Sequence, residues 1–247
     1  MGGGGPAACL TKADGSALSL VHSDVNAMDR NPHNFLSVDF DRSAATWDEK
    51  PTRVELANAV VQAIRARVPL SVRMDAMEYG CGTGLLTLAL APSLASVTAV
   101  DSSPGMLDVL GRKVRDAGIT NVEARLMDLT RDAVPDKRFH LVYSSMTLHH
   151  VGPVERLMKV FFDLLHSGGW IALADLDTED GSFHQGAEGI SHFGFDRAAL
   201  ERMLVKVGFV VPHTETAHTI QKEFPNGLRR DYSVFLLTAR KPETSSD

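Results

Sequence analysis

From residue 51 onward, short apolar runs alternate with longer stretches whose apolar residues recur at helical spacing. The apolar runs are 72–80, 96–101, 121–129, 139–145 and 170–176, and the helical stretches are 51–68, 83–92, 103–118, 152–169 and 196–208. Strands that alternate with helices predict a mainly parallel sheet covered by helices on both faces. Two further apolar runs, 209–223 and 231–241, predict two closing strands.

Capping residues support several of these helices. Pro51 suits the first turn of the first helix, and Ser103 with Pro104 forms a plausible start for the helix at 103–118. Asp196 is a candidate N-cap, and Gly208 follows the end of the same helix.

The chain of 247 residues suits one compact domain with extensions. Residues 1–30 are rich in Gly, Ala, Ser and Asp and predict a flexible leader. The rest, 31–247, predicts a single domain, in which 31–70 form an N-terminal lid and helix and 71–241 form a Rossmann-like core.

Charge and cysteine content narrow the class of protein. A formal net charge of −6 disfavours a nucleic-acid partner. The two cysteines, Cys9 and Cys81, lie far apart and show no zinc-binding spacing. No apolar run is long enough for a membrane helix, and the N-terminus is a poor signal peptide. We therefore expect a cytoplasmic protein without a membrane partner.

A glycine-rich turn, "EYGCGTG", follows the first predicted core strand and precedes a helix. Its glycines are Gly80, Gly82 and Gly84, with Cys81 between the first two. The spacing departs from the GxGxxG pattern of dinucleotide sites and lacks the Gly-Lys-Ser/Thr ending of a phosphate loop. Glu78 directs a negative charge to this turn, which repels a pyrophosphate and suits a ligand with an ammonium group.

Acidic residues also end the next two predicted strands. A carboxylate at Asp101 can accept hydrogen bonds from both hydroxyls of a ribose. Asp128, at the end of the third strand, is placed to meet the amino edge of an adenine. Ammonium, ribose and adenine partners at three consecutive strand ends indicate S-adenosylmethionine, which carries these groups and no phosphate.

With "EYGCGTG", "VTAVDSSPGML", "RLMDL", "FHLVYSSMTLHHV" and "LHSGGWIALADL", the stretch 45–240 resembles class I S-adenosylmethionine-dependent methyltransferases of the small-molecule type 11 or 12 group. The resemblance implies a three-layer αβα Rossmann-like fold with a seven-stranded, mainly parallel sheet and an antiparallel C-terminal hairpin strand. The implied cofactor-binding residues are Glu78, Gly80, Cys81, Gly82, Gly84, Asp101, Ser102, Met106, Asp128, Leu129, Ser144 and Ser145.

Within that set the resemblance assigns a part of the cofactor to each group. The turn residues face the methionine part, and Cys81 is expected to be a packed residue rather than a nucleophile. Asp101 and Ser102 flank the ribose and adenine, and Met106 packs on the adenine. Asp128 and Leu129 hold the adenine edge, while Ser144 and Ser145 lie beside the sulfonium.

Two histidines follow the fourth strand and are the catalytic candidates. His149 or His150 can take a proton from an acceptor, because histidine titrates near neutral pH. We favour His150 for the cofactor side, with the alternative that both histidines are structural. No metal is expected, since Tyr143-Ser144-Ser145 stands where metal-dependent catechol-type relatives have an aspartate ligand.

Two further segments are expected to border the pocket. In residues 31–50, Phe35, Phe40 and Trp47 would form an apolar lid, with an ordinary surface arm as the alternative. The polar stretch 175–196 would overhang the site; Asp175, Asp177, His184 and His192 are its candidate ligands, although such loops are usually only solvated.

The sequence thus predicts methyl transfer from S-adenosylmethionine to a small-molecule acceptor. A non-catalytic binding protein on the same fold remains an alternative. A nicotinamide-dependent oxidoreductase is a second alternative, which the glycine spacing and Glu78 disfavour. The acceptor and the oligomeric state are not encoded in any pattern that we recognise.

Overall fold

The computed structural model describes residues 1, 40–185 and 189–243. The chain divides into two units, Met1–Asn31 and Pro32–Asp247, and all helices and strands described below belong to the second. The predicted leader after Met1, the first nine residues of the predicted lid and Phe35 lie outside the described residues. The leader and the lid therefore stay predictions.

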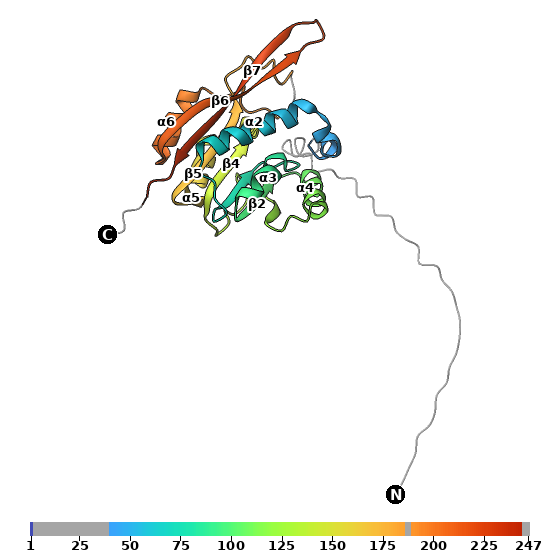
Figure 1. Cartoon of the computed structure of the whole chain (residues 1–247), viewed down its shortest axis with the longest axis vertical. Helices are drawn as coiled ribbons and strands as arrows, with labels where there is room; N and C mark the ends of the chain where they lie inside the picture. Colours follow the sequence, from blue (N-terminus) through green and yellow to red (C-terminus); the bar gives the residue numbers. More distant parts are fainter. Residues whose placement is uncertain (2–39, 186–188, 244–247) are drawn as a thin grey trace, which may run out of the picture. The chain divides into compact units, whose positions relative to one another are not determined.

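A seven-stranded sheet forms the centre of the described chain, in the order β3-β2-β1-β4-β5-β7-β6 (Figure 1). The strands are β1 (Asp75–Tyr79), β2 (Ser96–Asp101), β3 (Val122–Leu126), β4 (Phe139–Ser145), β5 (Leu165–Leu176), β6 (Val210–Glu223) and β7 (Arg229–Arg240). The pairs among β1 to β5 are parallel, whereas β7 is antiparallel to both β5 and β6. The predicted methyltransferase fold with its antiparallel closing strand is confirmed.

Helices pack on both faces of this sheet. They are α2 (Pro51–Arg67), α3 (Leu85–Leu90), α4 (Pro104–Asp116), α5 (Val154–Leu164) and α6 (Arg197–Val207). Side chains of α2 and α3 share one apolar core with alternate residues of β1, β4 and β5, such as Ala76, Leu141 and Ala172. The intervening residues, such as Met77 and Val142, join α5 and α6 in the core on the other face. The period of two along each strand thus separates two cores.

Local capping agrees with the sequence patterns. The Ser103 hydroxyl accepts a hydrogen bond from the Met106 backbone N–H at the start of α4, and Asp196 caps α6 through the Ala199 N–H. Gly208 ends α6 in the left-handed conformation, with φ of 119°. These caps satisfy backbone groups that a helix terminus leaves unpaired.

The predicted boundary between 152–169 and 170–176 is wrong. Helix α5 ends at Leu164, and β5 already begins at Leu165, which pairs with Phe139 of β4. The parallel register shifts before the next pair, Leu141 with Trp170, and Gly168 takes a positive φ of 74° in between. This irregularity absorbs the extra residues that the helical periodicity had assigned to the helix.

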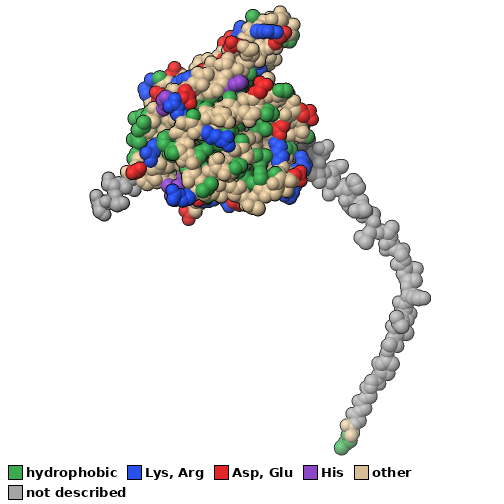
Figure 2. Space-filling model, in the orientation of Figure 1, with side chains coloured by type: hydrophobic (Ala, Val, Ile, Leu, Met, Phe, Trp, Pro, Cys, Tyr) green, Lys and Arg blue, Asp and Glu red, His purple; other side chains and the backbone are tan. Residues whose placement is uncertain are grey.

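Strands β6 and β7 form a hairpin that extends past the neighbouring strands (Figure 1). The face shown in Figure 2 interleaves acidic, basic and apolar side chains. Within the part of the chain that the structure describes, no helix is long and apolar enough to cross a membrane.

Candidate functional site

The glycine turn connects β1 to α3 and lies at the carboxyl ends of the parallel strands. The backbone N–H groups of Gly80 and Cys81 both donate to the Val100 carbonyl of β2, at 2.8 and 3.0 Å. Gly80 has φ of 71°, and a Cβ on it would lie 2.2 Å from Thr147 Oγ1. The turn therefore needs glycine both for its conformation and for its contact with the segment after β4.

Glu78 lies under the turn in a buried position. It is 2% exposed, accepts a hydrogen bond from the Thr87 hydroxyl and adjoins Tyr143. Burial raises the pKa of its carboxyl from 4.5 to about 8, against the opposing effect of the Thr87 hydrogen bond. The sequence predicted a carboxylate that offers its charge to a ligand; in this arrangement the acid is mainly neutral at pH 7.

Cys81 follows in the same turn and is 5% exposed. Burial, with a smaller contribution from the charge of Glu78, raises the pKa of its thiol well above the ordinary value. A protonated, buried thiol is a poor nucleophile, so this environment suits a packed residue.

Asp101 ends β2 and connects this strand to the glycine turn and to the start of α4. Its carboxylate accepts from the Gly82 N–H at 2.7 Å and from the Ser103 N–H at 2.9 Å. Burial raises its pKa, and these backbone hydrogen bonds oppose the rise. Two of the lone-pair positions on the carboxylate are used in this way, which leaves others for a ligand.

Residues after Asp101 extend the same edge. Ser102 is exposed, and Met106 is 1% exposed in the first turn of α4. A Cβ on Gly82 would lie 3.9 Å from the Met106 sulfur, so this side chain packs directly against the glycine turn. Sequence reasoning therefore grouped residues that are close in space.

Asp128 and Leu129 lie just beyond β3, which ends at Leu126. One Asp128 oxygen accepts from the Thr130 N–H and hydroxyl, at 2.9 and 2.7 Å, and the carboxylate also pairs with Arg131 at 3.5 Å. Leu129 is 2% exposed and belongs to the core. The Asp128 side chain thus organises its own loop.

Ser144 and Ser145 end β4 next to the glycine turn. The Ser144 hydroxyl donates to the Tyr79 carbonyl at 2.7 Å, and Thr147 Oγ1 donates to the Ser145 carbonyl at 3.0 Å. Ser144 is buried, whereas Ser145 is half-buried. These bonds fix the segment after β4 against the end of β1.

His149 lies in η4 (Leu148–His150) and is held by Asp175 of β5. Its Nδ1 lies 2.6 Å from Asp175 Oδ1, and its backbone N–H donates to Asp175 Oδ2 at 3.2 Å. The exposed fractions of the two residues are 3% and 0%. Asp175, a candidate ligand in the stretch expected to overhang the pocket, is a fully buried residue of β5.

His150 and His184 flank His149. The centroid of the His149 ring lies 4.2 Å from the centroid of the His150 ring and 4.9 Å from that of the His184 ring. Burial, followed by the neighbouring His149, lowers the pKa of His150 to about 4, and the same two causes lower the pKa of His184. Both flanking imidazoles are therefore neutral and weakly basic at pH 7.

The described part of the predicted lid, residues 40–50, packs along the glycine turn and α4. Asp41 accepts hydrogen bonds from the Ser103 hydroxyl and from the Gly105 N–H, the latter at 2.8 Å. Asp48 accepts from the Thr83 hydroxyl at 2.6 Å and pairs with Lys113. We call these contacts of Asp41 and Asp48 the aspartate clasp.

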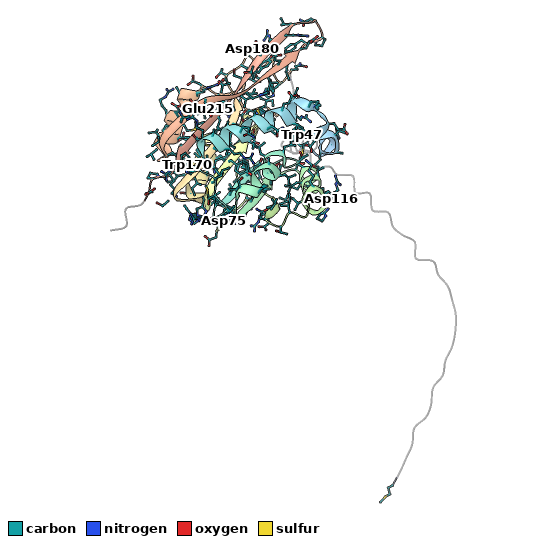
Figure 3. The ribbon with its side chains drawn as sticks, in the orientation of Figure 1. Trp47, Asp75, Asp116, Trp170, Asp180 and Glu215 are labelled. Carbon is teal, nitrogen blue, oxygen red and sulfur yellow. The ribbon has the colours of Figure 1, made fainter. Side chains whose placement is uncertain are left out.

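Aromatic contacts extend from the same segment toward the histidines. The Phe40 ring lies 5.3 Å from the His150 ring in an edge-on arrangement, and 5.7 Å from Trp47. Trp47, labelled in Figure 3, also stacks with the Arg53 guanidinium at 3.4 Å. Phe40 thus borders His150, and Trp47 borders Phe40 and Arg53, while their role as an apolar cover stays a prediction.

The stretch after β5 uses its other polar candidates in structural contacts. Asp177 forms a bidentate ion pair with Arg197 at 2.7 and 2.6 Å. His192 Nε2 lies 3.0 Å from the Val151 carbonyl oxygen. Among the described residues, His, Cys, Asp and Glu side chains form no group of three or more arranged to hold a metal ion.

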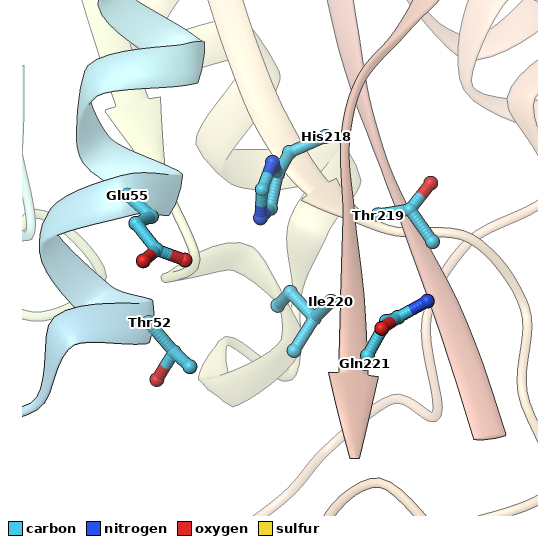
Figure 4. A pocket seen from close by; sticks show the side chains of 6 residues that line it. All are labelled: Thr52, Glu55, His218, Thr219, Ile220 and Gln221. Atoms are coloured by element: carbon cyan, nitrogen blue, oxygen red, sulfur yellow. The ribbon is translucent and has the colours of Figure 1, made fainter. Parts of the chain in front are cut away.

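A separate cleft of about 350 Å³ opens between the start of α2 and the end of β6 (Figure 4). Glu55 and His218 project into it from the two elements. Its other lining residues are Thr52, Thr219, Ile220 and Gln221. None of the predicted site residues lines this cleft.

Sequence reasoning missed the clasp residues Asp41, Asp48 and Lys113, because no local pattern distinguishes them from other surface charges. It also missed that Asp175 holds His149. A signal for that pair was present: an aspartate inside the apolar run "WIALADL" needs a buried partner.

Comparison with known proteins gives one domain family. Residues 76–169 match the family model described as "Methyltransferase domain". This region runs from β1 through η4 to the start of β5, and so includes the glycine turn, Asp101 and both histidines.

Individual relatives agree with this match. An uncharacterised methyltransferase of Schizosaccharomyces pombe is 28% identical over 135 residues, which are 49% of this chain and 48% of the relative. Trans-aconitate 2-methyltransferase of Delftia acidovorans is 30% identical over 123 residues, or 49% and 44% of the two chains. The alignments thus span about half the length of these curated relatives.

The DhpI–SAH complex is a similar solved structure, with a TM-score of 0.63 and 23% identity. The likeness covers 84% of this chain and 95% of that one. At this level of identity it shows the shared fold.

Proposed function

We propose that this chain, whose residues 76–169 match the methyltransferase domain family, transfers a methyl group from S-adenosylmethionine to a small-molecule acceptor. The single observation that carries the proposal is the Asp101 carboxylate, which bonds both the Gly82 N–H of the glycine turn and the Ser103 N–H before α4. This arrangement brings an acid suited to ribose hydroxyls, a glycine-rich turn and the Met106 sulfur to one edge of the sheet, which supports the proposal.

The residues of that edge fit the proposed cofactor in chemistry. Gly82, whose Cβ position has no atom nearer than 3.9 Å, leaves backbone open for close approach by a methionine chain, and Gly80 and Gly84 shape the turn around it. Asp101 offers lone pairs to ribose hydroxyls. Met106 and Leu129 offer apolar surface to an adenine, with Ser102 and Asp128 at its polar edge and Ser144 and Ser145 toward the sulfonium. Glu78 fits an ammonium group once it loses its proton.

When bound, S-adenosylmethionine supplies a methyl group on a positively charged sulfur, open to in-line displacement. The chain's own contribution is proximity, alignment and exclusion of water. We assign alignment to the glycine turn and exclusion of water to Phe40, which packs against the His150 ring, and to Trp47, which packs against Phe40. The aspartate clasp holds the segment that carries both rings.

We propose that this transfer needs no metal ion. The proposal rests on the end of β4, where metal-dependent catechol-type relatives have an aspartate ligand. This chain has Tyr143-Ser144-Ser145 there, and the Ser144 hydroxyl donates to the Tyr79 carbonyl. A test is turnover after dialysis against a chelator, compared with turnover after Mg²⁺ is restored. A rate that depends on the added ion would refute metal independence.

The cofactor is tested by thermal shift with S-adenosylmethionine, S-adenosylhomocysteine and NAD at equal concentrations. A ligand that binds only the folded state raises the melting temperature, by an amount set by its concentration relative to Kd. We expect both adenosyl ligands to raise it and NAD to leave it unchanged. A shift with NAD alone would instead favour an oxidoreductase.

Turnover needs a second experiment, because a binding protein on this fold would pass the first. The chain is incubated with methyl-labelled S-adenosylmethionine and a small-molecule extract of cells that express it. Labelled product is expected to require Asp101, with Asp108→Ala as a control at an exposed acid of α4. Tight binding without any transfer would favour the non-catalytic alternative.

A further inference from the structure

We propose that His149, positioned by Asp175, accepts the proton of the acceptor, and that this acceptor therefore arrives as a hydroxyl or ammonium rather than as a carboxylate. The proposal rests on the methyltransferase function above. In it, His149 is the catalytic residue and Asp175 is a positioning residue.

The contacts of Asp175 fix the His149 ring from two sides. One carboxylate oxygen lies 2.6 Å from Nδ1 and also accepts the Leu176 N–H at 2.8 Å, while the other accepts the His149 backbone N–H at 3.2 Å. A carboxylate accepts hydrogen bonds and does not donate them, so the ring hydrogen lies on Nδ1. Nε2 is then left with a lone pair, which is what a proton acceptor needs.

The place of η4 brings the backbone of His149 close to the glycine turn. Thr147, two residues earlier, contacts the Gly80 carbonyl through Oγ1 at 3.4 Å, and the Ser191 and His192 N–H groups donate to the His149 carbonyl at 2.9 and 3.0 Å. The backbone around His149 is thus held between the glycine turn and the stretch after β5.

His150 is less suited to the same task, although the sequence favoured it. Its environment keeps its pKa at about 4, so it binds a proton weakly at neutral pH. Its Nδ1 lies 3.2 Å from the Gly189 carbonyl oxygen, and its ring packs against Phe40. We assign it, with His184, to the neutral walls around His149.

The charges near His149 fit an acceptor without negative charge. Asp175 is hydrogen-bonded to His149, and the charges of Glu179 and Lys222 act on the neighbouring His184. Lys222 donates to the Phe183 carbonyl and lies over the Phe183 ring at 4.1 Å. For a hydroxyl acceptor, the proton would pass to His149 Nε2 as an oxygen lone pair bonds the methyl carbon and the cofactor sulfur keeps the electron pair of the broken bond. An ammonium acceptor would first give its proton to Nε2, and the freed nitrogen lone pair would then bond the methyl carbon. The resulting imidazolium is stabilised by Asp175.

The tautomer of His149 tests the proposal without turnover. In ¹⁵N-labelled protein at pH 7, long-range ¹H–¹⁵N correlation spectra assign the hydrogen of each histidine ring. We expect the His149 hydrogen on Nδ1 in the wild type and a shift of population toward Nε2–H in Asp175→Asn, as replacement of a carboxylate by an amide changes the acceptor. Asp177→Asn, whose carboxylate pairs with Arg197, is the matched control and should leave these signals unchanged.

A wild-type spectrum with the hydrogen on Nε2 would overturn the proposal, and it requires no variant that might fail to fold. Calorimetry with S-adenosylhomocysteine on the same samples tests the cofactor independently. Absence of binding there would refute the proposed function, whatever the tautomer.

The class of acceptor is read from the labelled products of the extract experiment. Methyl esters release labelled methanol in mild alkali, whereas methyl ethers and N-methyl groups keep the label. We expect alkali-stable product whose formation falls at least tenfold in Asp175→Asn. Alkali-labile ester as the main product would contradict the inferred acceptor class.

Discussion

At the scale of single residues, Asp101 has the most specific predicted effect. Asp101→Ala should weaken binding of S-adenosylhomocysteine by roughly 1–3 kcal/mol, because hydrogen bonds to a charged group and the anchoring of the Gly82 N–H are lost together. Calorimetry measures the change, with exposed Asp108→Ala as the control. Equal affinity in the two variants would remove Asp101 from the ribose site.

Glu78 gives a prediction on stability. Its pKa is about 8 in the folded chain against an ordinary 4.5, so the folded state holds a proton that the unfolded state releases. Its contribution is complete below pH 4.5 and is lost as pH rises toward 8, with an upper bound on the order of 3–5 kcal/mol. Urea unfolding between pH 5 and 8.5 should therefore show a steeper loss in the wild type than in Glu78→Gln.

The sequence grouped residues that meet in space, although it did not indicate their partners, and the roles of these residues stay predictions. The glycines, Asp101 and Met106 lie within strict local patterns and meet in space. The ionisation of Glu78 was not predictable, because burial by Thr87 and Tyr143 depends on packing between distant segments. The sequence could not distinguish His149 from His150 for the same reason. Asp175, which holds the His149 ring, lies 26 residues away along the chain.

At the scale of elements, the β1–α3 turn distinguishes two glycines. Gly84 has φ of 83°, and a Cβ there would lie 2.3 Å from a Leu110 methyl carbon, whereas Gly82 has φ of 51° with its nearest atom at 3.9 Å. Gly82→Ala should cost about 1 kcal/mol of stability from conformation alone. Gly84→Ala should cost about 2–4 kcal/mol, because overpacking against α4 is added. Similar urea midpoints for both variants would refute this distinction.

The aspartate clasp is the second prediction at this scale. Asp48→Asn should weaken S-adenosylhomocysteine binding about two- to fivefold, since partly exposed ion pairs are worth about 0.5–1 kcal/mol. The neighbouring exposed Glu49→Gln is the control. In a double-mutant cycle with Lys113→Met, the effects should be less than additive; full additivity would mean that the pair does not couple the two segments.

The periodicity of apolar residues predicted which segments form helices and which form strands, but it did not predict the boundary between α5 and β5. The apolar face of 51–68 predicted α2, and alternating runs predicted the parallel strands. The extension of β5 back to Leu165 depends on pairing with Phe139, a contact between strands that helical periodicity in 152–169 concealed.

At the scale of the whole molecule, the alternation of strands and helices predicted the covered, mainly parallel sheet that the structure shows. The seven strands and the antiparallel closing hairpin were expected from the family resemblance, and the structure confirms them. How residues 40–50 pack on the glycine turn could not be predicted, because Asp48 and Thr83 meet across 35 positions of sequence.

We expect the aspartate clasp to make the exchange of cofactor sensitive to ionic strength. Asp48 and Lys113 keep 30% and 29% of their side chains exposed, so dissolved ions reach and screen the pair. The screening length falls from about 30 Å at 0.01 M salt to about 10 Å at 0.1 M. If this segment must open before the bound cofactor leaves, residence times measured by stopped-flow will shorten as potassium chloride rises, and the dependence will be weaker in Asp48→Asn.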